Sequence, residues 1–154
     1  MITWQQIMDA ITTRSGTILV INGYYTDLGR HVFVHLSRPL ISTEHQDELP
    51  ALVLRDVNDA VVQQWSGNPG QYDHHLSIEA EVVAAPGTLD MTVARQMAID
   101  FWKMAGVDET WGGLAMRTYL DAAEPVLQKE EKVVEGVLIK FRVFYKTTRF
   151  KESL

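Results

Sequence analysis

Apolar residues spaced three and four positions apart predict two helices. The first covers residues 3–15, and the second runs from about residue 89 to residue 105. Gly16 and Gly106 follow them, and a glycine at that position commonly ends a helix. Thr3 could cap the first helix, and Thr88 or Asp90 could cap the second. The apolar stripes consist of Trp4, Ile7, Met8 and Ile11 in the first helix and of Val93, Met97 and Phe101 in the second.

Alternating apolar and polar residues predict strands elsewhere in the chain. Residues 31–36, HVFVHL, have the composition of a half-buried strand, and LPALVLRDV starts another strand at Pro50. The segments AVVQQW and HHLSIEAEVVA flank SGNPGQYD, which predicts a hairpin with a long loop. The alternation in the second arm, HHLSIEAEVVA, predicts a strand with one buried face and one solvent-exposed face, as in an antiparallel sheet. Its apolar side is Leu76, Ile78, Ala80 and Val82, and its polar side is Ser77, Glu79 and Glu81.

Two further strands are predicted near the C-terminus. Residues 116–128 have no clear period, so an edge strand and a helix broken at Pro125 both fit; we favour the strand. The segment VEGVLIKFRVFYKTT alternates most clearly, and QKEEK supplies a charged turn before it. One face of that last strand consists of Val137, Ile139, Phe141, Val143 and Tyr145.

The order of these elements predicts an α+β fold. We expect an antiparallel (mixed) sheet covered on one face by two helices. A chain of 154 residues can bury a core of its own, so residues 1–154 are expected to form a single domain with a flexible C-terminal end.

Composition excludes several classes of function. The formal net charge of −6 argues against tight, nonspecific binding of duplex DNA, which requires a basic face. The chain has no cysteine, which excludes disulfides, thiolate zinc sites and cysteine nucleophiles. Neither a secretory signal nor a membrane span is evident, so we expect a cytoplasmic protein with no membrane contact.

The residues that could carry chemistry do not form a convincing site. Asp73, His74 and His75 are the strongest candidates for a metal site, but adjacent strand residues point to opposite faces. His31 and His35 would share one face of a strand at about 13 Å, which is too far apart to hold one ion. We therefore expect these histidines to face solvent or an interface, and we predict no enzyme activity, no cofactor and no metal.

One stretch, INGYYTDLGRHVFVHLSRPL, gathers Tyr24, Tyr25, Asp27, Gly29 and Arg30 just before a predicted strand. A phosphate-binding loop, a metal turn or a contact between subunits would each explain this grouping. A phosphate-binding loop requires a lysine or a glycine spacing that the stretch lacks. Tyrosine and arginine are favoured at interfaces, so we favour the subunit contact. A purely local turn, in which the two tyrosines pack inside their own subunit, is the alternative.

The chain resembles the tail terminator, or tail completion, proteins of long-tailed bacteriophages, the relatives of the lambda-type minor tail protein U. The resemblance begins with the N-terminal helix, GYYTDLGRHVFVHLSRP, an acidic loop and ELPALVLRD. It continues through HHLSIEAEVVA and a helix, and it ends with WGGLAMRTYLDAAEPVLQKEEKVVEGVLIKFRVFYKTTR. It therefore spans about residues 3–149. In HLSRPL the chain departs from the Gly-Arg pair that relatives often carry.

The resemblance implies a tail-terminator-like fold and a structural role in the virion of a phage or prophage. Relatives form a hexameric ring that caps the tail tube, ends tail polymerisation and provides the head–tail joining surface. The expected partners are other copies of this chain, the tail tube protein and a head-completion or connector protein. The protein would lie in the host cytoplasm during assembly and then in the virion tail.

Within such a ring, Tyr24, Tyr25, Asp27 and Arg30 are candidates for the subunit interface. Glu79 and Glu81 are candidates for the channel wall, where DNA would pass without specific binding because carboxylate and phosphate repel each other. The alternatives are a related head–tail connector or tail-tube protein of the same fold, a generic binding module, or a small metal-dependent enzyme that uses the Asp73–His75 segment.

Overall fold

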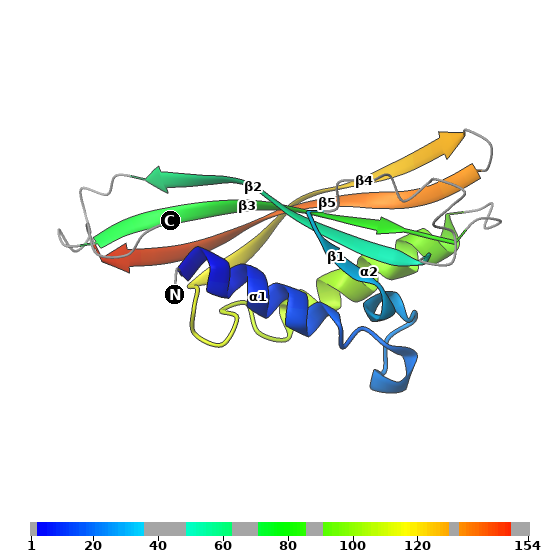
Figure 1. Ribbon diagram of the computed structural model, residues 1–154, viewed down its shortest axis with the longest axis horizontal. Coiled ribbons are helices and arrows are strands. Elements are labelled where there is room, and N and C mark those ends of the chain that lie inside the picture. Colours follow the sequence, from blue (N-terminus) through cyan, green and yellow to red (C-terminus); the bar gives the residue numbers. More distant parts are fainter. Residues whose placement is uncertain (1–2, 36–48, 63–70, 86–90, 130–132, 149–154) are drawn as a thin grey trace.

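The computed structural model describes residues 3–35, 49–62, 71–85, 91–129 and 133–148. Within these ranges the chain forms two α-helices, two short 3-10 helices and five strands (Figure 1). In chain order they are α1 (Thr3–Ser15), η1 (Val20–Asn22), η2 (Leu28–Arg30), β1 (Val32–Val34), β2 (Ala51–Val62), β3 (Gln71–Val83), α2 (Thr92–Gly106), β4 (Arg117–Lys129) and β5 (Val133–Thr148).

The five strands form one mixed sheet with the order β1-β2-β3-β5-β4. β1 pairs with β2 in parallel, and all other neighbours pair antiparallel. Both α-helices lie on the same side of this sheet (Figure 1). The predicted α+β class, with a mixed sheet covered on one face by two helices, is therefore confirmed.

The core lies between the helices and the sheet face that they cover, which we call the inner face. α1 contributes Ile7, Met8 and Ile11, and α2 contributes Met97, Phe101 and Met104, all of them buried. The alternation predicted for β3 and β5 is confirmed, because the apolar side chains of both strands point to the inner face and are at most 3% exposed. These side chains are Leu76, Ile78, Ala80, Val82, Val137, Ile139, Phe141, Val143 and Tyr145.

The strand boundaries correct two expectations. The strand expected over residues 31–36 covers only Val32–Val34, since His35 has a left-handed φ of 51°. The segments at 50–57 and 60–65 were expected as separate strands, but through Val62 they form one strand, β2, which continues past a bulge between Asp56 and Asn58. α2 begins at Thr92, so the expected start near residue 89 and its caps Thr88 and Asp90 fall outside the described residues.

Residues 116–128, for which strand and helix both fitted, lie almost entirely in an edge strand. β4 covers Arg117–Lys129 and pairs with β5 along its length, apart from a bulge between Leu120 and Ala122. Pro125 is tolerated because this strand is at the edge of the sheet. Of the helices in the described ranges, none has the length and the apolar character to cross a membrane.

Candidate functional site

A buried carboxylate on α2 fixes the turn that contains the two adjacent tyrosines. Asp100 is fully buried, and its oxygens accept hydrogen bonds from the backbone amides of Tyr25 (3.0 Å) and Thr26 (2.8 Å). The Thr26 hydroxyl donates a third bond at 2.7 Å. Because a buried carboxylate is costly unless it is hydrogen-bonded, these three bonds hold the turn firmly against α2.

Gly29 explains why the same turn lies so close to the end of α1. A Cβ atom at this position would lie 2.7 Å from the carbonyl oxygens of both Ser15 and Gly16, which is closer than real Cβ atoms approach. The Gly29 amide also donates a hydrogen bond to the Ile18 carbonyl at 2.8 Å. A glycine is needed here because two backbone segments touch.

The four residues expected at a subunit interface divide into two groups. Tyr24 packs against the core, with the Lys103 ammonium 5.2 Å from its ring centre, and Asp27 accepts a hydrogen bond from the Val20 amide at 2.9 Å. By contrast, Tyr25 is 65% exposed and the Arg30 side chain is 70% exposed. The local-turn alternative thus describes Tyr24, whereas Tyr25 and Arg30 are available to another molecule.

His74 lies in a buried polar cluster at the end of the sheet where β3 begins. Its Nδ1 is 2.8 Å from Asp59 Oδ2, and its Nε2 is 2.7 Å from the Thr147 hydroxyl. The Tyr145 hydroxyl donates to the other Asp59 oxygen at 2.9 Å, and the Tyr145 ring stacks on the imidazole. Burial, followed by the bond to Asp59 and the charge of that carboxylate, raises the pKa of Tyr145 far above its usual value.

This cluster corrects the expectation that the histidines face solvent or an interface. His74 is only 2% exposed because it occupies the inner-face side of β3, in register with Tyr145. The order Thr147, His74, Asp59 is that of a nucleophile, its base and an orienting carboxylate. However, Thr147 is 4% exposed and the Asp59 side chain 1%, so a substrate cannot reach the hydroxyl. The cluster is therefore structural.

The other candidate metal ligands contact groups other than His74. His75 lies on the opposite, outer face of the sheet, as expected for the strand neighbour of His74. Its ring stacks on that of Phe144, with the ring centres 3.9 Å apart. His31 Nδ1 is 3.3 Å from the Pro50 carbonyl oxygen, and His35 contacts the Asp56 carboxylate. Within the described ranges, no three histidine or acidic side chains are placed so that they could hold one metal ion.

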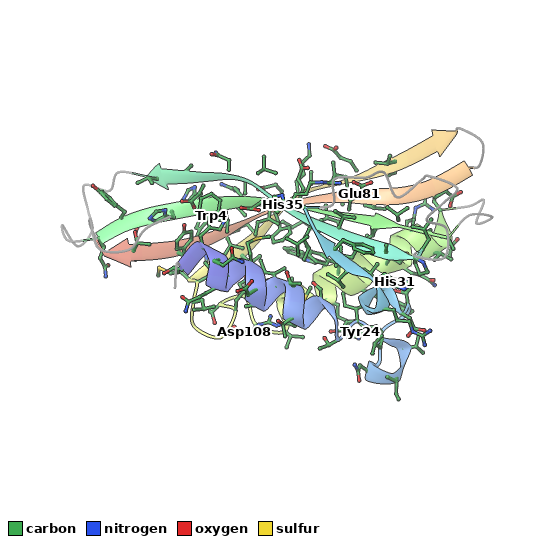
Figure 2. All side chains as sticks on the ribbon, in the orientation of Figure 1. Trp4, Tyr24, His31, His35, Glu81 and Asp108 are labelled. Carbon is green, nitrogen blue, oxygen red and sulfur yellow. The ribbon has the colours of Figure 1, made fainter. Side chains whose placement is uncertain are left out.

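Glu79 and Glu81 lie on the outer face, where acidic and basic side chains alternate across the strands. Figure 2 shows Glu81 on the side of the sheet away from Trp4 and α1. Glu81 pairs with Arg55 at 3.0 Å, and Glu79 stands in register between Arg55 and Lys140. Further ion pairs on this face are Glu124–Lys140 (3.3 Å), Asp121–Arg142 (2.9 Å) and Asp73–Lys146 (3.6 Å). These ion pairs balance most of the charges on this face, which also carries a small buried apolar cluster that includes Ala51, Val53 and Val83.

A hollow of about 340 Å³ opens on this outer face, near the beginning of β3 and β4 and the end of β5. Its aromatic wall consists of the stacked His75–Phe144 pair and of Tyr119, whose ring lies 4.8 Å from Phe144. Arg117 lies beside this wall and donates a hydrogen bond to the Tyr119 hydroxyl at 2.8 Å. The remaining lining residues include Asp73, Lys146 and the exposed Met116.

Both edges of the sheet carry exposed apolar side chains. On one edge, β1 covers only residues 52–54 of β2. Residues 55–62 pair with β3 on one side and with no strand of the described structure on the other; we call this part the β2 edge. It exposes Val57 (58%) and Val61 (44%). The opposite edge is formed by β4, and near the start of this β4 edge Met116 (58%) and Leu120 (43%) are exposed. These positions were not singled out from the sequence, because exposure at an edge depends on the strand order.

The sequence matches no protein-family model, and it matches no curated protein.

Proposed function

We propose that this protein is a non-enzymatic tail terminator of a long-tailed phage or prophage. It forms a hexameric ring that caps the tail tube, stops tail polymerisation and joins the tail to the head-completion protein. The observation that carries the proposal is the presence of two different apolar edges on opposite sides of one sheet. The resemblance of the sequence to tail terminators supports the identity of the assembly.

A ring requires a heterologous interface, in which one patch of each subunit meets a different patch of the next. The β2 edge and the β4 edge differ in sequence and lie on opposite sides of the subunit, as such an interface demands. β2 and β4 also run in opposite directions, because every pairing from β2 through β3 and β5 to β4 is antiparallel. A β4 edge placed against the β2 edge of the next subunit therefore continues the antiparallel order.

The apolar positions on the two edges belong to the same end of the sheet. Val61 is in register with His74, and His74 is in register with Tyr145 of β5. Arg117, which follows Met116, is in register with Phe144, the neighbour of Tyr145. The far end of the β4 edge carries Pro125, which lacks an amide donor and disfavours strand addition. Pairing is thus favoured near Met116 and Leu120.

The outer face supplies a candidate channel wall that carries Glu79 and Glu81. Cross-strand ion pairs occupy most of its basic side chains, so few cations are left to bind phosphate. DNA would pass because this wall offers little net attraction, and general repulsion by acidic residues is not required. Tyr25 and Arg30, whose side chains are both exposed, are candidates for additional contacts between subunits.

Light scattering coupled to size exclusion tests the ring. The wild-type protein is expected to reach six times the chain mass of 17.4 kDa in a concentration-dependent manner. Val57→Lys should block the β2 edge and Leu120→Lys the β4 edge, because a buried unpaired charge opposes strand pairing. Val107→Lys, at a position that is 71% exposed after α2, is the matched control and should leave the ring intact.

Mixing the two edge variants gives the sharper result. Each variant retains the edge that the other has lost, so a heterologous interface predicts a mixture that stops at dimers. Rings formed by either edge variant alone, or a monomeric wild-type protein at every concentration, would contradict the proposal. Electron microscopy separates the related alternative, since a tail-tube protein would stack into long tubes whereas a terminator stops at a ring.

A further inference from the structure

The hollow on the outer face has two properties of a binding site for a partner protein. One wall is aromatic and apolar, and the other carries a cation, Arg117, that forms no ion pair with a carboxylate of the described residues. The aromatic wall is preformed, because Phe144 is held between His75 on one side and Tyr119 on the other. Met116, which is 58% exposed, extends the apolar surface.

Arg117 is the unneutralised cation. Its guanidinium donates to the Tyr119 hydroxyl and lies 5.6 Å from that ring. No carboxylate of the described residues forms an ion pair with it, whereas the second cation of the hollow, Lys146, pairs with Asp73 at 3.6 Å. The bond to Tyr119 raises the pKa of Arg117, so the charge persists at every relevant pH. The guanidinium has further N–H donors, and two of them can bind both oxygens of one carboxylate in a bidentate arrangement.

We propose that this hollow docks a segment of a partner protein in which an aromatic or large apolar side chain stands beside a carboxylate. The apolar group would pack on the wall formed by His75, Phe144 and Tyr119, and the carboxylate would bind Arg117. The site lies at one end of the sheet, away from the central Glu79 and Glu81, where a partner stacked on that end can reach it. The proposal stands on the hollow alone and does not require the ring.

The charge of the hollow favours a carboxylate over a nucleic acid. Two cations and one carboxylate line it, and one cation is already paired, so it offers a single free positive charge. Nucleic-acid binding draws its affinity from several phosphate contacts and weakens where a carboxylate such as Asp73 is near. Bases of duplex DNA are also stacked on one another and cannot pack on the aromatic wall.

The methyl group of Met116 reports directly on the hollow. In full-length protein with ¹³C-labelled methionine methyl groups, N-acetylphenylalanine is the probe, and N-acetylphenylalaninamide is the neutral control of the same shape. The acid should shift the Met116 signal in a saturable way, while the signals of the buried Met8, Met97 and Met104 stay in place. The amide should bind about tenfold more weakly, because it lacks the charge-assisted bonds to the guanidinium.

Two variants and one further probe complete the test. Arg117→Gln should reduce the affinity for the acid to that for the amide, whereas Arg95→Gln, the same change at an exposed position on α2, should have no effect. Equal affinity of wild-type protein for the acid and the amide, or no shift of Met116, would overturn the proposal without any variant. Tighter binding of phenyl phosphate than of the acid would overturn it in favour of a phosphate ligand. Ring formation is measured separately with the Val57→Lys and Leu120→Lys variants, so a failure of acid binding and a failure of the ring can be told apart.

Discussion

Removing the Tyr145 hydroxyl isolates one bond of the buried polar cluster. In Tyr145→Phe the ring, which is 1% exposed and stacks on His74 at 4.5 Å, keeps its volume and its contacts. What is lost is the hydrogen bond to Asp59 at 2.9 Å. A hydrogen bond to a charged group contributes about 1.5–3 kcal/mol to stability. Because Asp59 retains His74 as a partner at 2.8 Å, the carboxylate is not left alone, and we expect a loss of about 2 kcal/mol.

Urea denaturation at fixed protein concentration measures this loss, because association would otherwise contribute to the apparent stability. For a chain of this size, about 2 kcal/mol corresponds to a fall in Tm of roughly 4–8 °C. Tyr25→Phe is the matched control, since Tyr25 is 65% exposed, and it should remain within about 0.5 kcal/mol of the wild type. If Tyr145→Phe also stays within that margin, the cluster does not stabilise the sheet as we have reasoned.

Three further predictions concern the helix-side turns. Gly29→Ala should cost more than about 2 kcal/mol in a urea titration, because its Cβ would meet backbone atoms that cannot move aside. Asp100→Ala should cost about 3 kcal/mol and expose the turn amides to hydrogen exchange, since it removes the bonds that hold Tyr25 and Thr26; unchanged protection would contradict this role. The Thr110 hydroxyl, followed by the backbone amides of the same turn, lowers the pKa of Asp108 from 3.8 to about 2. The stability that this shift contributes is therefore complete above about pH 4 and is lost as the pH falls towards 2. In Asp108→Asn, the free energy of unfolding should depend less on pH in this acidic range.

The elements that could be predicted from the sequence are those whose period is set locally. Both helices and the strands β3 and β5 follow from apolar residues at intervals of about 3.6 and of two, because one face of each packs on the same core. The parallel pairing of β1 with β2 could not be predicted, since it joins residues 32–34 to residues 52–54, which are far apart in the sequence. The merging of two expected strands into β2 depended on a bulge, and a bulge shows no periodic signal.

The buried polar residues His74 and Asp100 stand out in the sequence, but their hydrogen-bond partners could not be predicted from it. His74 occupies the same side of β3 as Leu76 and Ile78, and Asp100 lies three residues after Met97 on the apolar side of α2. A polar residue in an apolar stripe indicates that something must compensate it. The compensating groups are far away in sequence, as Thr147 is from His74 and Thr26 from Asp100. Only the folded topology brings these pairs together.

The residues expected to stabilise the fold and the residues expected to mediate assembly lie in different parts of this molecule. Asp59 and His74 on the inner face, and Asp100 on α2, have their hydrogen-bond partners within the same chain, so substitutions there should change the free energy of unfolding. At the two sheet edges, the exposed side chains of Val57, Val61, Met116 and Leu120 lie beside backbone groups that could pair with another strand, so substitutions there should change the mass of the assembly. Tyr145→Phe should therefore still form the ring at temperatures below its lowered Tm, whereas Val57→Lys should unfold like the wild-type monomer and fail to close a ring. A substitution on the inner face that altered the subunit number without lowering stability would show that the two properties are not separable.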